Sequence, residues 1–153
     1  MSKEKLTFIC PVYNEQEVIK EFYSELEIEV KSLHSLYDVK ILFVVDKCSD
    51  NTFEILSEIA KNNDLVSIIL LSKRFGHQMS LIAGIDHAPN SIIIMMDSDL
   101  QHPVKIITKL INKYKEGSDI VFTVRKNNVG QGYFRNLFSK IFYKLLNTIS
   151  DIE

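Results

Sequence analysis

The chain has 153 residues, a formal net charge of −2 and a sequence pI near 6.1, with 46% hydrophobic and 25% charged residues. This composition excludes a disordered chain, the near-neutral charge excludes nucleic-acid binding through bulk positive charge, and the length suits one domain. The two cysteines are too few for a disulfide framework and favour a reducing compartment, and no apolar run approaches the roughly 18 residues of a membrane span.

Short apolar runs alternate with longer amphipathic patterns along the whole chain. Residues 1–5 lead directly into a strand-like run and do not have the pattern of a signal peptide. In chain order we expect a strand at 6–10 that Pro11 stops, a helix at 15–36, a strand at 39–45, a helix at 53–62, a strand at 66–71, a helix at 78–88, a strand at 92–96, a helix that Pro103 opens, a strand at 119–124 and a helix at 131–149. Strands without polar alternation, separated by helices, predict an α/β fold with a mostly parallel sheet covered on both faces. We expect residues 1–153 to form one domain.

Polar side chains follow each of the five predicted strands. In such sheets, ligands bind outside the carboxyl ends of the strands. The residues at these ends are Asn14 and Glu15, Asp46, Lys73 and Arg74, Asp97 and Asp99, and Arg125. This recurrence predicts a binding site along one edge of the sheet.

Asp97-Ser98-Asp99 follows the most apolar predicted strand. Two carboxylates at this spacing can bind one divalent cation, and Mg²⁺ or Mn²⁺ often shares such ligands with substrate phosphates. Gln101 adds a neutral oxygen nearby. Without any metal, Asp99 close to Pro103 would also stabilise a helix N-terminus.

The first strand ends in Pro11-Val12-Tyr13-Asn14-Glu15. Tyr13 could stack on a base, and the next two side chains could bond a sugar or a base edge. Alternatively, Asn14 caps a helix and Glu15 is an acid of its first turn.

Four segments occur in order: 11–15, 45–52, 71–78 and 96–103, read as PVYNE, VDKCSDNT, LSKRFGHQ and MDSDLQHP. Together they resemble the family 2 glycosyltransferases of the GT-A fold. The resemblance is greatest to the branch that transfers sugar to dolichyl or undecaprenyl phosphate, and it covers essentially the whole chain.

The resemblance implies roles for individual residues. The positions that match the nucleotide-binding residues of the family are Pro11, Tyr13, Asn14, Glu15, Asp46, Lys73 and Ser98. Among these, Asp46 matches the acid that reads the base and Ser98 lies beside the ribose, whereas Lys73 could equally belong to a solvated loop. Asp97, Asp99 and Gln101 match ligands of a Mg²⁺ or Mn²⁺ ion on the donor diphosphate. Arg125 and Arg135 match basic residues around the acceptor phosphate.

The sequence departs from the family pattern after the second strand. Two acids followed by Gly and Ser are usual there, and this chain has Val45, Asp46, Lys47 and Cys48. The identity of the donor base therefore stays open between UDP- and GDP-sugars. Cys48 is interpreted as a packed residue, because nothing near it in the sequence is placed to act as its base.

The implied activity is an inverting transfer of sugar from a nucleotide-diphosphate donor to an acceptor, a polyprenyl phosphate. No general base is identified within residues 1–153. The alternative is a nucleotide-sugar-binding module without turnover. A Rossmann-type cofactor domain is disfavoured, because no Gly-x-Gly-x-x-Gly loop follows the first strand.

Residues 133–149 carry a wide apolar stripe, with Lys140 and Lys144 off it. Such a segment either lies at a membrane surface or packs on the rest of the protein. We expect a cytoplasmic location, at the cytoplasmic face of the membrane. The sequence ends at Glu153, where similar enzymes continue, so we expect the donor-binding part of a longer enzyme.

Overall fold

A computed structural model describes residues 3–101 and 103–124 of the chain. The chain divides into two compact units, Met1–Asp119 and Ile120–Glu153. Every described helix and strand lies in the first unit. The described helices include none that is both long and apolar enough to cross a bilayer.

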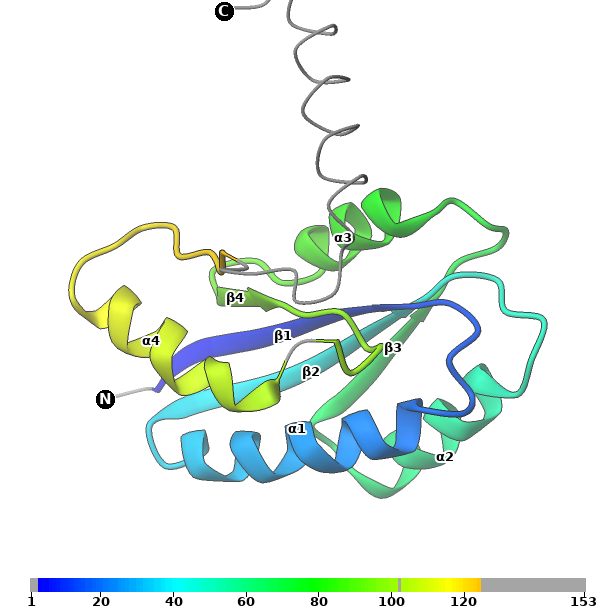
Figure 1. The fold of residues 1–153 in the computed structure, drawn as a ribbon, viewed down its shortest axis with the longest axis horizontal. Coiled ribbons are helices and arrows are strands. Elements are labelled where there is room, and N and C mark those ends of the chain that lie inside the picture. The colour runs from blue at the N-terminus through cyan, green and yellow to red at the C-terminus, as the bar shows by residue number, and fades with distance from the viewer. Residues whose placement is uncertain (1–2, 102, 125–153) are drawn as a thin grey trace, which may run out of the picture. The chain divides into compact units, whose positions relative to one another are not determined.

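Strands and helices alternate through the first unit (Figure 1). In chain order the elements are β1 (Glu4–Val12), α1 (Ile19–Leu33), β2 (Tyr37–Val45), α2 (Thr52–Asn62), β3 (Val66–Leu70), α3 (His77–Asp86), β4 (Ile92–Met95), the 3-10 helix η1 (Val104–Ile106) and α4 (Ile107–Lys115). The four strands form one parallel sheet in the order β3-β2-β1-β4. This confirms the predicted α/β fold class, although α1 is shorter than the expected helix at 15–36.

The two faces of the sheet follow from the period of two along β1 and β2. Phe8 and Phe43 belong to the larger apolar core, whereas Ile9 and Val44 belong to the smaller core on the other face. In Figure 1, α1 and α2 lie on one face of the sheet and α3 lies on the other. Both faces are therefore covered, as the continuously apolar strands predict.

The first strand does not stop at Pro11 as the sequence suggested. β1 continues to Val12, and Pro11 pairs in register with Val44 of β2. The carbonyl of Val12 accepts a hydrogen bond from the Asp46 N–H, so in this parallel strand Pro11 faces the β4 side. Pairing with β4 ends at Ile9, so no ladder bond requires an N–H from Pro11.

The expected strand at 119–124 is absent, because none of these residues is in a strand and the described sheet has four strands. An apolar alternation shows which side chains could be buried, but a strand forms only where a partner takes up its backbone hydrogen bonds. No described strand pairs with this segment. The expected helix at 131–149 lies outside the described residues.

Candidate functional site

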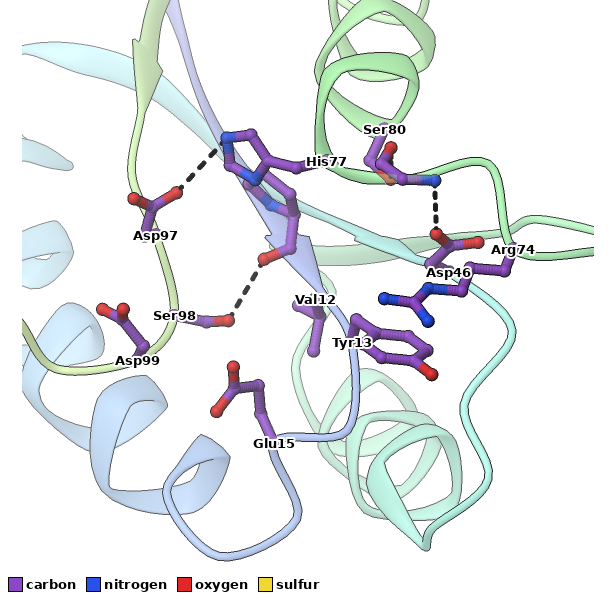
Figure 2. A pocket seen from close by; sticks show the side chains of 12 residues that line it. Val12, Tyr13, Glu15, Asp46, Arg74, His77, Ser80, Asp97, Ser98 and Asp99 are labelled. Atoms are coloured by element: carbon purple, nitrogen blue, oxygen red, sulfur yellow. Dashed lines mark hydrogen bonds and ion pairs between the residues drawn. The ribbon is translucent and has the colours of Figure 1, made fainter. Parts of the chain in front are cut away.

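A pocket of about 460 Å³ opens at the carboxyl ends of the strands. Figure 2 shows the carboxylates that follow β4 on one side and Asp46 with Arg74 on the other. Tyr13 and Glu15, from the loop after β1, lie between these two sides. The volume suits a small-molecule ligand. The structure thus brings together residues that the sequence spreads over almost ninety positions.

The loop after β4 is tied to β1 through Ser98. This side chain is buried, and its Oγ donates a hydrogen bond to the Pro11 carbonyl at 3.1 Å. Its neighbours Asp97 and Asp99 line the pocket and are only partly buried. The buried serine therefore anchors the loop and leaves the two carboxylates accessible to a ligand.

A tight turn orients Asp99. Its Oδ1 accepts a hydrogen bond from the Gln101 N–H at 2.9 Å, and Leu100 between them has a φ of 59°. The left-handed region is costly for a leucine and is held only where the surroundings enforce it. This turn places the Asp99 carboxylate at the pocket.

Asp97 faces the first residue of α3. The Nε2 of His77 lies 3.7 Å from its Oδ1, and both side chains are about half exposed, at 52% and 46%. An exposed pair of this kind contributes little stability. His77 is thus a partly exposed polar residue that also lines the pocket.

Glu15 adds a further carboxylate to the pocket, beside Asp97, Asp99 and Asp46. Burial raises the pKa of Glu15, and the negative charges of Asp99 and Asp50 raise it further. These acids therefore form a region of negative potential in which a cation would be stabilised. Carboxylate oxygens are the donors that Mg²⁺ and Mn²⁺ prefer, so the residues fit the predicted metal in their chemistry.

The described residues contain no group of three or more His, Cys, Asp or Glu side chains arranged as a complete metal cage. A divalent cation at Asp97 and Asp99 would thus need further ligands from water or from a phosphate. Mg²⁺ commonly binds in this way, through one or two carboxylates and substrate phosphates.

We expect Glu15→Gln to stabilise the metal-free protein at pH 7 by roughly 0.2–1 kcal/mol, the range of partly exposed charge interactions. An acid whose pKa is raised by folding destabilises the folded state once it ionises, so stability falls as the pH rises through this titration. The advantage of glutamine should therefore shrink at pH 4, where Glu15 is largely protonated. Thermal unfolding of the variant and the wild type at both pH values measures this difference in stability.

Glu17→Gln is the control, since Glu17 is an exposed acid in the same loop. It should change the melting temperature by less than Glu15→Gln does. A stabilisation by Glu15→Gln that is equal at both pH values would contradict the electrostatic explanation.

Tyr13 and Arg74 form the aromatic and basic part of the pocket. The Cζ atom of Arg74 lies 4.3 Å from the centroid of the Tyr13 ring, a cation–π contact. Arg74 belongs to the loop between β3 and α3, so this contact connects two strand-end loops. In Figure 2 the guanidinium lies above the ring and extends toward the middle of the pocket.

Asn14 lies outside the pocket lining. Its Oδ1 accepts a hydrogen bond from the Ser49 N–H at 2.9 Å, and its Nδ2 donates to the Ser49 Oγ at 3.1 Å. Its backbone N–H donates to the Cys48 Sγ at 3.3 Å. Asn14 thus connects the loops after β1 and β2. It has a φ of 54°, a conformation that asparagine tolerates better than most residues.

Cys48 is half-buried, and burial is the main cause that raises its pKa. A thiol with a raised pKa is a poor nucleophile at neutral pH. This agrees with the interpretation of Cys48 as a packed residue.

Lys73 and Gln101, which were also predicted for the site, are not among the residues that line the pocket. Lys73 is exposed and does not line the pocket; its Nζ lies 5.1 Å from the Phe75 ring centroid. Gln101 is exposed and contributes its backbone N–H to the Asp99 turn. Arg125 and Arg135 lie outside the described residues.

The sequence placed Arg74 among the polar residues at the strand ends but assigned no role to Ser80, and both line the pocket. Arg74 stands next to the chosen Lys73, and only the path of the loop decides which of the two turns inward. Ser80 lies one turn into α3 and is buried. A single serine in a helix carries no sequence signal for a site.

The comparisons with known proteins identify the family of this chain. The family model described as "Glycosyl transferase family 2" matches residues 7–151. The chain belongs to glycosyl transferase family 2. The resemblance read from the four ordered motifs is therefore confirmed.

Curated relatives match nearly all of the chain. The "Uncharacterized glycosyltransferase YkcC" of Bacillus subtilis is 37% identical over 147 residues, which are 96% of this chain and 45% of the relative. The "Prophage bactoprenol glucosyl transferase homolog" of Escherichia coli is 37% identical over 96% of this chain and 47% of its own length. The "Bactoprenol glucosyl transferase" of Shigella phage SfV is 36% identical over 95% of this chain and 47% of its own length. The chain thus spans about half the length of these relatives.

Solved structures share the fold. A mannosyltransferase from Pyrobaculum calidifontis, solved in complex with GDP-Man and Mn²⁺, aligns with a TM-score of 0.55 at 23% identity over 65% of this chain and 28% of that one. Residues 1–349 of TarS from S. aureus, solved in complex with UDP, align with a TM-score of 0.54 at 17% identity. The alignment covers 80% of this chain and 40% of that one. The fold class is therefore that of GT-A glycosyltransferases.

Proposed function

We propose that this chain binds a nucleotide-diphosphate sugar together with Mg²⁺ or Mn²⁺ and forms the donor site of a glycosyltransferase that acts on a polyprenyl phosphate. The observation that carries the proposal is the grouping of Asp97, Asp99, Tyr13 and Arg74 around one pocket at the carboxyl edge of the sheet. Carboxylates can bind the metal, an aromatic ring can stack on the base, and arginine can bind phosphate through its planar fork.

The donor diphosphate would take the side of the pocket where Asp97 and Asp99 lie. The metal, once bound, neutralises the negative charge that develops on the leaving nucleoside diphosphate. Ser98 and the Pro11 carbonyl, joined by their hydrogen bond, form the floor next to the ribose in this proposal. Gln101 stays a proposed third oxygen ligand, and Lys73 a proposed contact at the rim.

The relatives named bactoprenol glucosyl transferase support a polyprenyl phosphate as the acceptor. In the proposed reaction an acceptor phosphate oxygen forms a bond to the anomeric carbon. The bond from that carbon to the diphosphate breaks, and its electron pair leaves with the nucleoside diphosphate, which inverts the configuration. A phosphate monoester has its second pKa near ~6, so at neutral pH it attacks without a strong general base. Arg125 and Arg135 are proposed to bind this phosphate.

The test combines binding and turnover. Calorimetric titration with UDP-glucose and GDP-mannose, with and without Mn²⁺, should reveal metal-dependent binding of at least one donor. Addition of undecaprenyl phosphate should then yield the glycosylated lipid, with the opposite anomeric configuration by NMR. Binding without transfer would favour the alternative, a nucleotide-sugar-binding module. Absence of metal-dependent binding would refute the proposal.

We also propose that residues 133–149, which lie outside the described residues, bind an anionic membrane surface. The side is the cytoplasmic face in this proposal, since both described cysteines are free thiols, as a reducing compartment favours. Phe138→Ser with Phe142→Ser should lower the partition coefficient onto phosphatidylglycerol vesicles, measured by co-sedimentation, by at least about 100-fold, because burial of each ring contributes about 1.5–3 kcal/mol.

The control for the vesicle assay is Ile28→Ser, which removes an exposed apolar side chain from α1. It should leave co-sedimentation unchanged. An unchanged result for the double variant would instead favour packing of this segment against the rest of the protein.

A further inference from the structure

Asp46 is a buried carboxylate at the end of β2. Its side chain and backbone are 3% exposed in total. Within the residues that the structure describes, no ion pair involves it. A buried charge requires compensation, so the question is which groups supply it.

Peptide N–H groups supply this compensation. The Oδ1 of Asp46 accepts hydrogen bonds from the N–H of Lys47 at 3.0 Å and of Phe75 at 3.0 Å. Its Oδ2 accepts from the Phe75 N–H at 3.1 Å and from the Gly76 N–H at 2.7 Å. Three N–H groups therefore donate to a carboxylate that offers about four lone-pair positions, so they occupy most of its acceptor capacity. A base N–H would therefore have to share the carboxylate with these bonds.

The bonds to Phe75 and Gly76 hold one specific loop. Gly76 has a φ of 88° and ends the loop directly before α3, so the carboxylate lies at the N-terminus of that helix. Charge-assisted bonds at a helix N-terminus are among the stronger ones. The residue before Phe75 is Arg74, whose guanidinium lies over Tyr13 in the pocket.

We propose that Asp46 is a positioning residue: its bonds to Phe75 and Gly76 fix the loop that places Arg74 on Tyr13, and the Arg74–Tyr13 pair contacts the nucleotide in place of the Asp46 carboxylate. The proposal deepens the proposed function and rests on it for its nucleotide-binding half. The sequence resemblance assigned base recognition to Asp46, and the hydrogen bonds favour this different role.

The first experiment compares the isosteric variant Asp46→Asn with the wild type for UDP, GDP, CDP and ADP in the presence of Mn²⁺. An amide directs a donor at one of the two loop N–H groups, so the loop is released. Affinity for all four nucleotides should fall by a common factor of about tenfold, with their ratios retained within about twofold. A change confined to one base would show that Asp46 reads the base and would overturn the proposal.

A double-mutant cycle then tests whether Asp46 acts through Arg74. On an Arg74→Ala background, Asp46→Asn should cause little further loss of affinity, because the residue that it positions is gone. Losses that multiply would mean that the two residues act independently, which contradicts the proposal. Asp38→Asn is the control, since Asp38 is exposed at the other end of the same strand and should change neither affinity nor ratios.

Amide hydrogen exchange tests the positioning role without any nucleotide. Exchange at Phe75 and Gly76 should accelerate at least about tenfold in Asp46→Asn and stay unchanged in Asp38→Asn. Unchanged exchange in Asp46→Asn would refute the positioning role even if nucleotides bind. Failure of the wild type to bind any nucleotide would refute the proposed function, while the exchange rates would still decide whether Asp46 holds the loop.

Discussion

Asp99→Ala is expected to abolish Mn²⁺-dependent binding of nucleoside diphosphates, weakening it at least about 100-fold. Even groups that only support metal ligands typically change metal affinity by about 10–100-fold when replaced, and a direct ligand should matter no less. Asp99 lies at the pocket with its carboxylate oriented by the turn at Leu100. Calorimetry with UDP and GDP, in Mn²⁺ and in EDTA, measures the loss.

Two further variants separate loss of the metal from loss of the loop. Asp99→Asn keeps an oxygen that can accept the Gln101 N–H, as Oδ1 does now at 2.9 Å, but it removes the charge. It should lose metal-dependent binding with little change in melting temperature. Asp64→Ala removes an exposed carboxylate just before β3, at the opposite end of the sheet, and should bind as the wild type. Wild-type binding by Asp99→Asn would refute the metal site.

Gly84→Ala is expected to destabilise the fold by about 1–3 kcal/mol, the usual cost of overpacking. Gly84 lies in α3, against the face of the sheet that carries the smaller apolar core. A Cβ at this position would overlap the Ile9 Cγ2 and lie 3.3 Å from the Val44 Cγ2. Both neighbours are β-branched and have little rotamer freedom, so the helix itself would have to shift. Thermal and urea unfolding should show the loss.

The sign of this result is diagnostic. In a helix exposed to solvent, alanine would stabilise by about 0.5–1 kcal/mol relative to glycine, so a rise in stability would contradict the close approach of α3. Ile85→Ala, which removes a partly exposed side chain from the same helix, should change stability by no more than about 0.5 kcal/mol. Because α3 begins at His77, a shifted helix should also weaken nucleotide binding.

The order and type of the first elements could be read from local patterns. The run at 39–45 predicts its strand because apolar side chains at consecutive positions require burial on both faces. Element ends were less accurate. The helix expected from Glu15 begins at Ile19, since the Glu15 carbonyl first accepts bonds from the N–H groups of Val18 and Ile19 in a turn. Pro11 was expected to end the first strand, but the strand continues because no neighbouring strand needs a hydrogen bond from this position.

Residue type and position after a strand were enough to select Asp97, Asp99 and Tyr13 for the site. The sheet topology explains why these three residues meet at one pocket, because parallel strands bring their carboxyl ends to one edge. Residue type could not show that Arg74 lines the pocket and Lys73 does not. Both are cations in one loop, and the bonds from Phe75 and Gly76 to Asp46 determine how that loop runs.

The sequence by itself determined the family, the α/β class and the acidic edge, because these depend on ordered motifs and on periodicities of two and 3.6 residues. Only the tertiary structure decided what individual polar side chains contact. The sequence predicts that Asp46 binds a ligand, yet its carboxylate oxygens accept hydrogen bonds from N–H groups about thirty residues away. The hydrogen-bond partners of a carboxylate are the donors that the fold brings within about 3 Å of it. Sequence spacing does not reveal which donors these are.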